Sequence, residues 1–253
     1  MERIKNLQGQ TALITGSSRG IGAAIASELA RRGAHVVIHG RHEASVTRMT
    51  DAIRRAGGDA TATVADVTKW EQLVKMREEV EREAGPISIL VANAGGSFSP
   101  PAALADISLE DWDTVLTGNL TATFLTLKAF VPMMQERSGG SVVTIASSAG
   151  RHVDSRAPLP YGVAKAGIIH LTKTIAQQSG PVRVNCIVPE TILTEDNRAH
   201  IPVEQQQTMA HMHPLNRLGT PEDIARAVAF LVSDESSWMS GSVIDISGGI
   251  ILN

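Results

Sequence analysis

The sequence predicts a doubly wound α/β fold, with seven parallel strands in one sheet and helices on both of its faces. Short runs rich in β-branched residues alternate with longer amphipathic segments along the chain. The runs are apolar on both faces, which is typical of buried parallel strands, and the segments between them are long enough for crossover helices. No repeat, low-complexity tract or linker divides the sequence, so we expect a single domain over 1–253.

The expected elements follow one another in a regular order. Strands are expected where apolar, β-branched and small residues run together, at 11–15, 35–39, 60–66, 88–94, 141–147, 182–188 and 242–247. Helices are expected where apolar residues return every three or four positions, at 21–32, 43–56, 69–84, 109–136, 160–178 and 221–233. The stretch 189–216 is the least regular and follows a strand, so we expect a substrate lid there.

The composition argues against several classes of protein. The 23 basic and 26 acidic residues are scattered and give a net charge of −3, so no basic stripe indicates a nucleic-acid partner. No apolar run approaches the ~20 residues that span a bilayer, and residues 1–9 are too charged for a signal peptide. We therefore expect a cytoplasmic protein that does not enter a membrane. The one cysteine, Cys186, lies in a β-branched run and is expected to be a buried thiol.

A glycine-rich turn joins the first expected strand to the first expected helix. The segment "TGSSRGIG", residues 15–22, has glycines at 16, 20 and 22, which let the backbone turn sharply and approach a ligand closely. The helix that begins at Ile21 presents its first N–H groups and its dipole to a phosphate. Glycine-rich turns are common, but this placement between a strand and a helix favours dinucleotide binding.

Six motifs occur in order along the chain: "TGSSRGIG", "NAG" at 93–95, "NL" at 119–120, "SSAG" at 147–150, "YGVAK" at 161–165 and "PETILT" at 189–194. Their order and spacing resemble the short-chain dehydrogenase/reductase family over about residues 9–249. The resemblance implies an oxidoreductase that uses NAD(P)(H) on one Rossmann-like domain. It implies a catalytic tetrad at Asn119, Ser147, Tyr161 and Lys165. It also implies cofactor contacts at Gly16, Ser18, Arg19, Gly20, Ile21, Gly22, Arg41, Asp66, Val67, Asn93, Ala94, Gly95, Tyr161, Lys165, Pro189, Ile192 and Thr194.

The spacing of Tyr161 and Lys165 has a physical rationale of its own. Reduction of a carbonyl needs a proton delivered to oxygen, and oxidation of an alcohol needs that proton removed. A free phenol, with a pKa of about 10, is poorly matched to this task near neutral pH. Positions i and i+4 share a helix face, so the lysine can lie beside the phenol oxygen or the cofactor ribose. At ~4 Å an ammonium group is worth about 4 kcal/mol to a phenolate, which makes the phenol usable.

The serine of the tetrad has two candidates. The strand register and Gly150 favour Ser147, whereas counting thirteen residues back from Tyr161 gives Ser148. We favour Ser147, because a loop absorbs a one-residue insertion more easily than a strand end does. Either hydroxyl would hydrogen-bond the substrate oxygen. Asn119 is expected inside the helix 109–136, where the resemblance implies that it holds a water linking the active-site lysine to solvent.

The end of the second strand favours NADP(H) as cofactor, with NAD(H) as the alternative. A domain selective for NAD normally has Asp or Glu there, and that carboxylate repels the 2′-phosphate of NADP. Here the position falls at His39 or Gly40 and is followed by Arg41, while Arg19 can approach the same phosphate from the glycine-rich turn. Two guanidinium groups around a dianion form strong charge-assisted hydrogen bonds, although Glu43 lies near enough to weaken the site.

These observations predict an enzyme that interconverts a small-molecule ketone and a secondary alcohol. The alternatives are a reductase of 3-oxoacyl thioesters on acyl carrier protein and a catalytically silent nucleotide-binding module. The intact tetrad opposes the silent module. The segment "TIAQQSGPVRVN", residues 174–185, is short and nearly uncharged, whereas an acidic carrier needs a cationic dock.

The loops around the expected site carry further charged residues. Arg151, His152 and Arg156 could offer cations to a small anionic substrate, and Glu190 stands where the family has glycine, so the lid geometry is expected to differ. The run "HMH", residues 211–213, has no third ligand at a suitable spacing, so no metal site is expected.

The helix 109–136 indicates an oligomer, and the resemblance implies a homotetramer. One apolar stripe is expected to face the sheet, formed by Trp112, Leu116, Leu120, Phe124, Leu127 and Val131. A second stripe lies on another side, formed by Val115, Ala122, Leu125, Ala129 and Met133. A helix covered on one side only should not have both, so we expect a second copy of the chain to cover the outer stripe. The apolar end 250–253 is expected to add a further contact.

Overall fold

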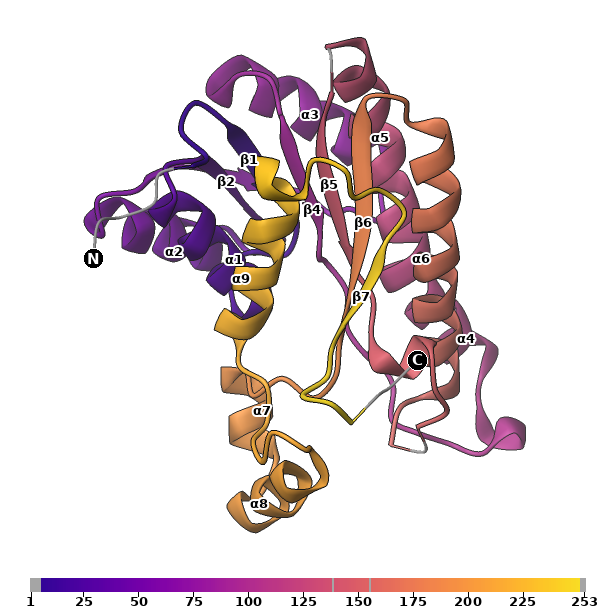
Figure 1. Cartoon of the computed structure of the whole chain (residues 1–253). Coiled ribbons are helices and arrows are strands. Elements are labelled where there is room, and N and C mark those ends of the chain that lie inside the picture. Colours follow the sequence, from indigo (N-terminus) through magenta and orange to yellow (C-terminus); the bar gives the residue numbers. More distant parts are fainter. Residues whose placement is uncertain (1–5, 138, 155, 251–253) are drawn as a thin grey trace.

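The computed structural model describes residues 6–137, 139–154 and 156–250. One parallel sheet forms its centre, with the strand order β3-β2-β1-β4-β5-β6-β7 (Figure 1). The strands are β1 (Thr11–Ile14), β2 (His35–Gly40), β3 (Asp59–Val64), β4 (Ile89–Ala92), β5 (Gly140–Ile145), β6 (Val182–Pro189) and β7 (Val243–Ile246). All seven expected strands are present and the doubly wound prediction is confirmed. The winding reverses between β1 and β4, which is where such folds bind their ligands.

Helices cover both faces of the sheet (Figure 1). One face carries α1 (Gly20–Arg31), α2 (Glu43–Arg55) and α9 (Pro221–Val232). The other carries α3 (Trp70–Ala84), α5 (Ala122–Glu136) and α6 (Leu159–Gln178), and α4 (Leu109–Leu116) leads into α5 through a π-helical turn at Thr117–Thr121. The six expected helices are therefore present, with the segment 109–136 divided by the π turn.

The central strands show why polar function is confined to one edge of the sheet. In β1, Ala12 and Ile14 pack in the cluster of the α1 and α9 face, and Leu13 packs in the cluster of the α3 and α5 face. All three side chains are fully buried, because successive residues of a strand point to opposite faces and both faces are covered. Polar side chains that a ligand can reach therefore lie beyond the ends of these strands, whereas Thr144 of β5 is buried and its Oγ1 lies 2.7 Å from Thr172 Oγ1. Cys186 of β6 is buried as expected, and burial raises the pKa of its thiol.

The predicted faces of α4 and α5 are wrong in part. Phe124 was expected against the sheet but its side chain is 44% exposed, whereas Val115, Ala122 and Ala129, expected on the outer stripe, are buried. The buried face also includes Thr123 and Thr126, which read as polar positions in the sequence. Thr126 Oγ1 donates to Ala122 O at 2.8 Å, so the hydroxyl is satisfied within the helix and can be buried. The buried face of α5 thus mixes small side chains with the large ones of Leu127, Phe130, Val131 and Met134, while Phe124 is exposed.

The stretch 189–216 contains two short helices, α7 (Glu195–His200) and α8 (Val203–Met212), beyond the carboxyl edge of the sheet (Figure 1). Neither helix has a buried residue, and the role of this stretch as a substrate lid, the name used for it below, stays a prediction. Of the expected apolar end, residues 251–253 lie outside the described ranges, as do residues 1–5. Within those ranges, no helix combines the length and the apolar character needed to cross a membrane.

Candidate active site

The glycine-rich turn between β1 and α1 folds as its glycines require. Gly16 and Gly20 have φ angles of 67° and 56°, in the left-handed region that favours glycine. A Cβ atom on Gly22 would lie 2.3 Å from Gly16 O, so the start of α1 closes onto the turn without room for a side chain. The first N–H groups of α1 have no partner inside the helix and can bind a pyrophosphate.

The "NAG" motif is bonded directly to this turn. Asn93 Nδ2 donates to Thr15 O at 2.9 Å and to Gly16 O at 3.2 Å. In return, Thr15 Oγ1 accepts hydrogen bonds from the backbone N–H groups of Asn93 and Ala94, at 3.0 and 3.1 Å. Two motifs that are distant in the sequence thus form one unit, because β1 and β4 are neighbours in the sheet.

His39 supports the turn from the other side, and its role was not foreseen from the sequence. Its Nδ1 accepts a hydrogen bond from Gly16 N at 3.0 Å, and its Nε2 lies 3.1 Å from Ala65 O, to which it donates. Its backbone N–H donates to Ser17 Oγ at 2.9 Å. The side chain is buried, and burial lowers the pKa of His39 to about 4, although Ala65 O and the charge of Asp66 act to raise it. His39 is therefore a neutral link between the turn, β2 and the end of β3.

The outer rim of this cradle contains the residues expected to select the cofactor. A Cβ atom on Gly40 would lie 3.1 Å from Ser18 Oγ, so Arg41 emerges next to the turn. Arg19 Nη1 instead lies 2.6 Å from Asp196 Oδ2 of α7, between side chains that are 75% and 57% exposed. An exposed ion pair of this kind contributes at most about 1 kcal/mol, so it is readily exchanged for a phosphate contact.

Asp66 and Val67 lie beyond the end of β3, next to the arginine rim. Asp66 Oδ1 accepts hydrogen bonds from Thr68 N at 2.9 Å and Thr68 Oγ1 at 2.7 Å. Burial raises the pKa of Asp66, but these bonds and the charges of Arg41 and Lys69 lower it by more, so the carboxylate is charged. Val67 is buried.

The start of the lid contacts the glycine-rich turn. A Cβ atom on Gly20 would lie 3.6 Å from Thr194 Cγ2, which places Thr194 beside the expected pyrophosphate position. Ile192 is buried and pairs with Gly219 in an isolated parallel bridge, and Leu193 N donates to Gly219 O at 2.8 Å. The segment after Pro189 is thus held between the cofactor cradle and the residues that precede α9.

Tyr161 and Lys165 share one face of α6, as the spacing predicts. Lys165 is only 4% exposed, and its Nζ donates to Ile145 O at the end of β5, at 3.0 Å. The same Nζ lies 5.4 Å from the centre of the Tyr161 ring, close enough for a favourable cation–π contact. The ammonium group is thus fixed beside the aromatic ring rather than extended into solvent.

Asn119 lies in the π-helical turn and approaches the same lysine. Its Nδ2 donates to Gly96 O at 2.8 Å and to Val115 O at 2.9 Å, and its Oδ1 accepts from Gly96 N at 3.2 Å. A Cβ atom on Gly95 would lie 2.5 Å from Asn119 Oδ1 and 3.6 Å from Lys165 Nζ. Gly95 therefore lets the asparagine and the lysine approach each other. Both amide protons of Asn119 are engaged and Oδ1 already accepts one hydrogen bond, so the second lone pair of Oδ1 is the side-chain position that remains for a water.

Ser147 lies two residues after the end of β5, and Ser148 begins a short 3₁₀ turn, Ser148–Gly150. Ser147 Oγ accepts a hydrogen bond from Ala149 N at 3.3 Å, which fixes the side chain at the start of that turn. A Cβ atom on Gly150 would lie 2.6 Å from Ala166 N, so this turn rests directly on the backbone of α6. Because α6 carries the tyrosine and the lysine, this close approach brings the serine-bearing turn to their helix.

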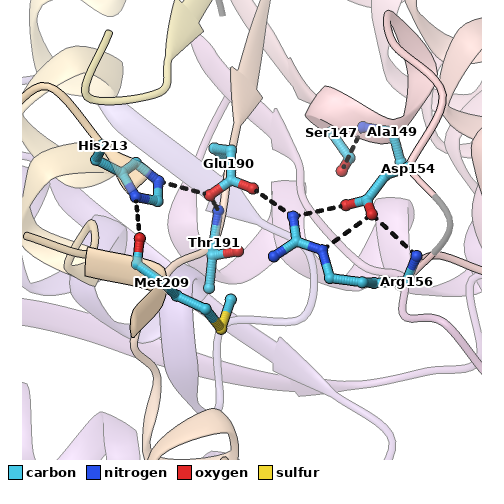
Figure 2. A network of polar contacts seen from close by, with 8 residues as sticks. All are labelled: Ser147, Ala149, Asp154, Arg156, Glu190, Thr191, Met209 and His213. Atoms are coloured by element: carbon cyan, nitrogen blue, oxygen red, sulfur yellow. Dashed lines mark hydrogen bonds and ion pairs between the residues drawn. The ribbon is translucent and has the colours of Figure 1, made fainter. Parts of the chain in front are cut away.

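A polar network joins the loop after Ser147 to the lid (Figure 2). Arg156 Nε and Nη2 bind the two carboxylate oxygens of Asp154, each at 3.0 Å, and Nη2 also lies 3.4 Å from Glu190 Oε1. His213 Nε2 lies 2.9 Å from Glu190 Oε2, which also accepts from Thr191 N. Glu190, which stands where the family resemblance implied glycine, thus connects two loops through its carboxylate.

This network shows how two of the cations noted in the loop after Ser147 are placed. Arg156 is paired with two carboxylates, and Arg151 Nη1 lies 3.1 Å from Asp245 Oδ2. The contacts with Glu190 and Asp245 join distant segments, so sequence spacing does not reveal them. The two outer histidines of the "HMH" run also diverge, since His211 Nδ1 lies 2.7 Å from Asn216 Oδ1. Over the described ranges, no three side chains of His, Cys, Asp or Glu are arranged to hold a metal ion.

Comparisons with known proteins agree with this geometry. A family model described as "Enoyl-(Acyl carrier protein) reductase" matches residues 16–251. The chain is 38% identical over 253 residues to "Dehydrogenase/reductase SDR family member 4" of Homo sapiens, covering 98% of this chain and 90% of that protein.

Two solved structures show the same fold over the whole chain. A 7α-hydroxysteroid dehydrogenase complexed with NADH and 7-oxo glycochenodeoxycholic acid has a TM-score of 0.91 at 34% identity, covering 100% of both chains. A gluconate 5-dehydrogenase from Burkholderia cenocepacia in complex with NADP and tartrate has a TM-score of 0.90 at 30% identity, covering 98% of this chain and 97% of that chain.

The buried, neutral state of His39 predicts a loss of stability in acid. Because its folded pKa of about 4 is below the ordinary 6.5, the unfolded chain binds the proton more tightly. This contribution to the free energy of unfolding is fully present above pH 6.5 and is lost as the pH falls toward 4, by about 3 kcal/mol in total. We expect His39→Gln to show a correspondingly weaker dependence over this interval, measured by urea unfolding at pH 7.5, 6, 5 and 4.5.

His170→Gln is the matched control, since His170 is exposed on α6 and should leave the pH dependence of unfolding unchanged. We also expect His39→Gln to bind nicotinamide cofactor more weakly, because Gly16 N loses its acceptor. Parallel stability curves for wild type and His39→Gln between pH 7.5 and 4.5 would contradict the assignment of a neutral, buried imidazole.

Proposed function

This chain belongs to the short-chain dehydrogenase/reductase family, and on that premise we propose that it interconverts a ketone and a secondary alcohol with NADP(H). Family membership makes it an oxidoreductase acting on CH–OH and C=O groups. The observation that carries the finer proposal is the buried Lys165 ammonium on the helix face of Tyr161, at the edge of the sheet that carries the glycine-rich turn.

The proposed chemistry assigns one task to each side chain of the tetrad. In reduction, the Tyr161 hydroxyl gives its proton to the carbonyl oxygen, and the Ser147 hydroxyl donates a hydrogen bond to the same oxygen. Lys165 stabilises the phenolate that forms, and a water held at Asn119 returns a proton from solvent. Oxidation of the alcohol runs these transfers in reverse. When bound, the cofactor supplies the hydride to the substrate carbon or accepts it from that carbon.

The cofactor proposal is supported by the shape of the cradle. Gly16, Gly20 and Gly22 leave backbone N–H groups where a pyrophosphate would bind, and a side chain at Gly22 would fill the turn. The 2′-phosphate of NADP would be held by Arg41 and Arg19. No carboxylate occupies the end of β2, where His39 is turned inward and bonded through both ring nitrogens.

The thioester reductase remains the second candidate, because the matching family model is described by an acyl carrier protein substrate. The basic residue of the segment 174–185 does not support it. Arg183 donates to the carbonyl oxygens of Ser233, Ser236 and Met239, so its guanidinium is turned into the fold and gives no dock for an acidic carrier. We therefore favour a free small-molecule substrate. The buried, unpaired Cys186 is compatible with the cytoplasmic location that we also propose.

We further propose a homotetramer in which α4 and α5 carry one of the subunit contacts. Large apolar side chains face outward on these helices, with Phe124 44% exposed. Lys128 Nζ lies 4.8 Å from the centre of the Trp70 ring and 6.0 Å from that of Phe124, so the outer face is continuous from α3 to α5. The inner face of α5 is already buried against the fold, and this outer one needs another partner to be buried.

The role of Tyr161 predicts a clean separation of catalysis from binding. We expect Tyr161→Phe to abolish turnover of ketones and alcohols, followed by nicotinamide absorbance, because only the exchangeable proton is removed. Cofactor affinity, measured by fluorescence titration, should change by less than about threefold. Lys165→Ala should weaken both, since it removes the partner of the phenol and the proposed ribose contact. Substantial turnover by the Phe variant at any pH would rule out the tyrosine assignment.

The arginine rim predicts the cofactor preference. We expect wild type to use NADP(H) more efficiently than NAD(H), and Arg41→Ala to lower kcat/KM for NADP(H) by roughly tenfold to a hundredfold with little effect on NAD(H). The reason is the loss of a charge-assisted bond worth about 1.5–3 kcal/mol. Arg48→Ala, which removes an arginine from α2, is the control and should leave the ratio unchanged. A wild type that favours NAD(H) would refute this proposal.

If the outer apolar face is a subunit contact, a negative charge placed on it should weaken the assembly. Light scattering at micromolar concentration should give a tetramer for wild type, and Phe124→Glu should shift it toward smaller species because the carboxylate would be buried at the contact. Lys173→Glu, on the exposed side of α6, is the control for an added negative charge. A stable wild-type monomer under these conditions would refute the proposed assembly.

A further inference from the structure

The network around Glu190 stands between the serine-bearing loop and the lid. Glu190 follows Pro189 at the end of β6, and Ser147 follows β5, the neighbouring strand. Asp154 and Arg156 belong to the loop that leads from Ser147 to α6, and His213 follows α8 of the lid (Figure 2). A substrate that reaches the tetrad from the lid side would therefore meet these side chains.

The charges of the network cancel within it. His213 Nδ1 lies 2.8 Å from Met209 O and its Nε2 lies 2.9 Å from Glu190 Oε2, so both ring nitrogens face acceptors. Both bonds can form only if the imidazole is doubly protonated or the carboxyl group carries the proton, and in either state Glu190 and His213 together are neutral. Arg156 and Asp154 form a second neutral pair through two parallel bonds.

The side chains of the network differ in solvent exposure, and this difference determines which of them a ligand can reach. The side chains of Glu190 and His213 are 7% and 4% exposed, whereas that of Arg156 is 46% exposed. Arg156 is therefore the accessible cation, and Asp154 and Glu190 are the groups that hold it. An incoming carboxylate would have to displace Asp154 from a bidentate contact or lie against the oxygens of Asp154 and Glu190 that already occupy the guanidinium.

We propose that Asp154 and Glu190 determine specificity by occupying the Arg156 guanidinium, Asp154 with a compensating charge and Glu190 with a further oxygen, so that the active site takes an uncharged carbonyl substrate in preference to a carboxylate-bearing one. This inference rests on the proposed ketone and alcohol activity and names the class of substrate for the same site. The opposite arrangement, in which the two carboxylates merely hold Arg156 in place until an acidic substrate displaces them, makes the opposite prediction.

The test compares two probes that differ in one charge, 4-oxopentanoate and its methyl ester. Their binding to the chain saturated with oxidised nicotinamide cofactor is measured by calorimetry, which needs no turnover. Wild type should bind the ester at least about threefold more tightly than the acid. Asp154→Asn and Glu190→Gln should each raise the ratio of acid to ester affinity, and the double variant should raise it roughly tenfold, as expected when a charge-assisted bond becomes available.

Glu81→Gln is the matched control, because it removes the same charge from an ion pair with Arg137, which precedes β5 at the amino edge of the sheet. Its ratio should equal that of wild type. Circular dichroism and melting curves verify that each variant is folded, and Asp154→Asn, on a partly exposed loop, tests the proposal separately if Glu190→Gln does not fold.

Two results would overturn the proposal. One is an unchanged ratio in the Asp154→Asn and double variants, including no detectable binding of the acid to them. The other is a wild type that prefers the acid and loses that preference in Arg156→Gln. Turnover of the two probes is measured separately. If neither is reduced while the binding ratios shift as expected, the proposed reaction fails and the proposed selectivity stands.

Discussion

The buried ammonium group of Lys165 is the constraint around which the carboxyl edge of the sheet is built. A charge in the interior is costly unless nearby groups replace its water. Ile145 O supplies a hydrogen bond from the end of β5, and the Tyr161 ring supplies a cation–π contact from the same helix. Gly95 allows Asn119 to approach, where a side chain would collide with it. The partners that stabilise the charge are thus the groups that the proposed proton transfer needs, so stability and chemistry place the same demand on this region.

Close backbone contacts make this arrangement possible, and they occur where the chain has glycine. Gly150 brings the turn after Ser147 onto α6, and Gly22 brings the start of α1 onto Gly16. At Gly150 and Gly22 a Cβ atom would lie well inside van der Waals contact with backbone, which cannot move aside as a side-chain end can. The glycines therefore fix the distances between elements, and the polar side chains follow from those distances.

The sequence predicts the structure well where it depends on neighbouring residues, and poorly where it depends on contacts between distant side chains. All seven strands and the glycine-rich turn could be predicted, because runs of β-branched apolar residues and the glycines of a turn are visible in neighbouring residues. The inner face of α5 could not, because Thr126 reads as polar until its bond to Ala122 O is known. In the sequence, His39 was noted only because it stands where an NAD-selective domain has Asp or Glu. In the structure its ring and backbone link three segments. Arg156 was considered only as a possible contact for an anionic substrate, because nothing in its spacing indicates that Glu190 lies beside it.

Through Glu190, the network connects the contacts of the Arg156 side chain with those of the residues at the end of the lid. Asp154 and Glu190 set the charge that a substrate meets at Arg156, while Glu190 and His213 hold the end of the lid to the end of β6. One carboxylate serves both contacts through different oxygens, since Oε1 faces the arginine and Oε2 faces the imidazole. A ligand that draws Arg156 away would therefore leave Glu190 bonded to His213 of the lid. Movement of the lid would leave Glu190 bonded to Arg156. Because the pair with His213 is almost fully buried and the pair with Arg156 is half exposed, the arginine contact is the one that solvent and ligands can exchange. Under the proposed selectivity, substrate charge would therefore act at the accessible end of the network, while the buried pair of Glu190 and His213 stays in place.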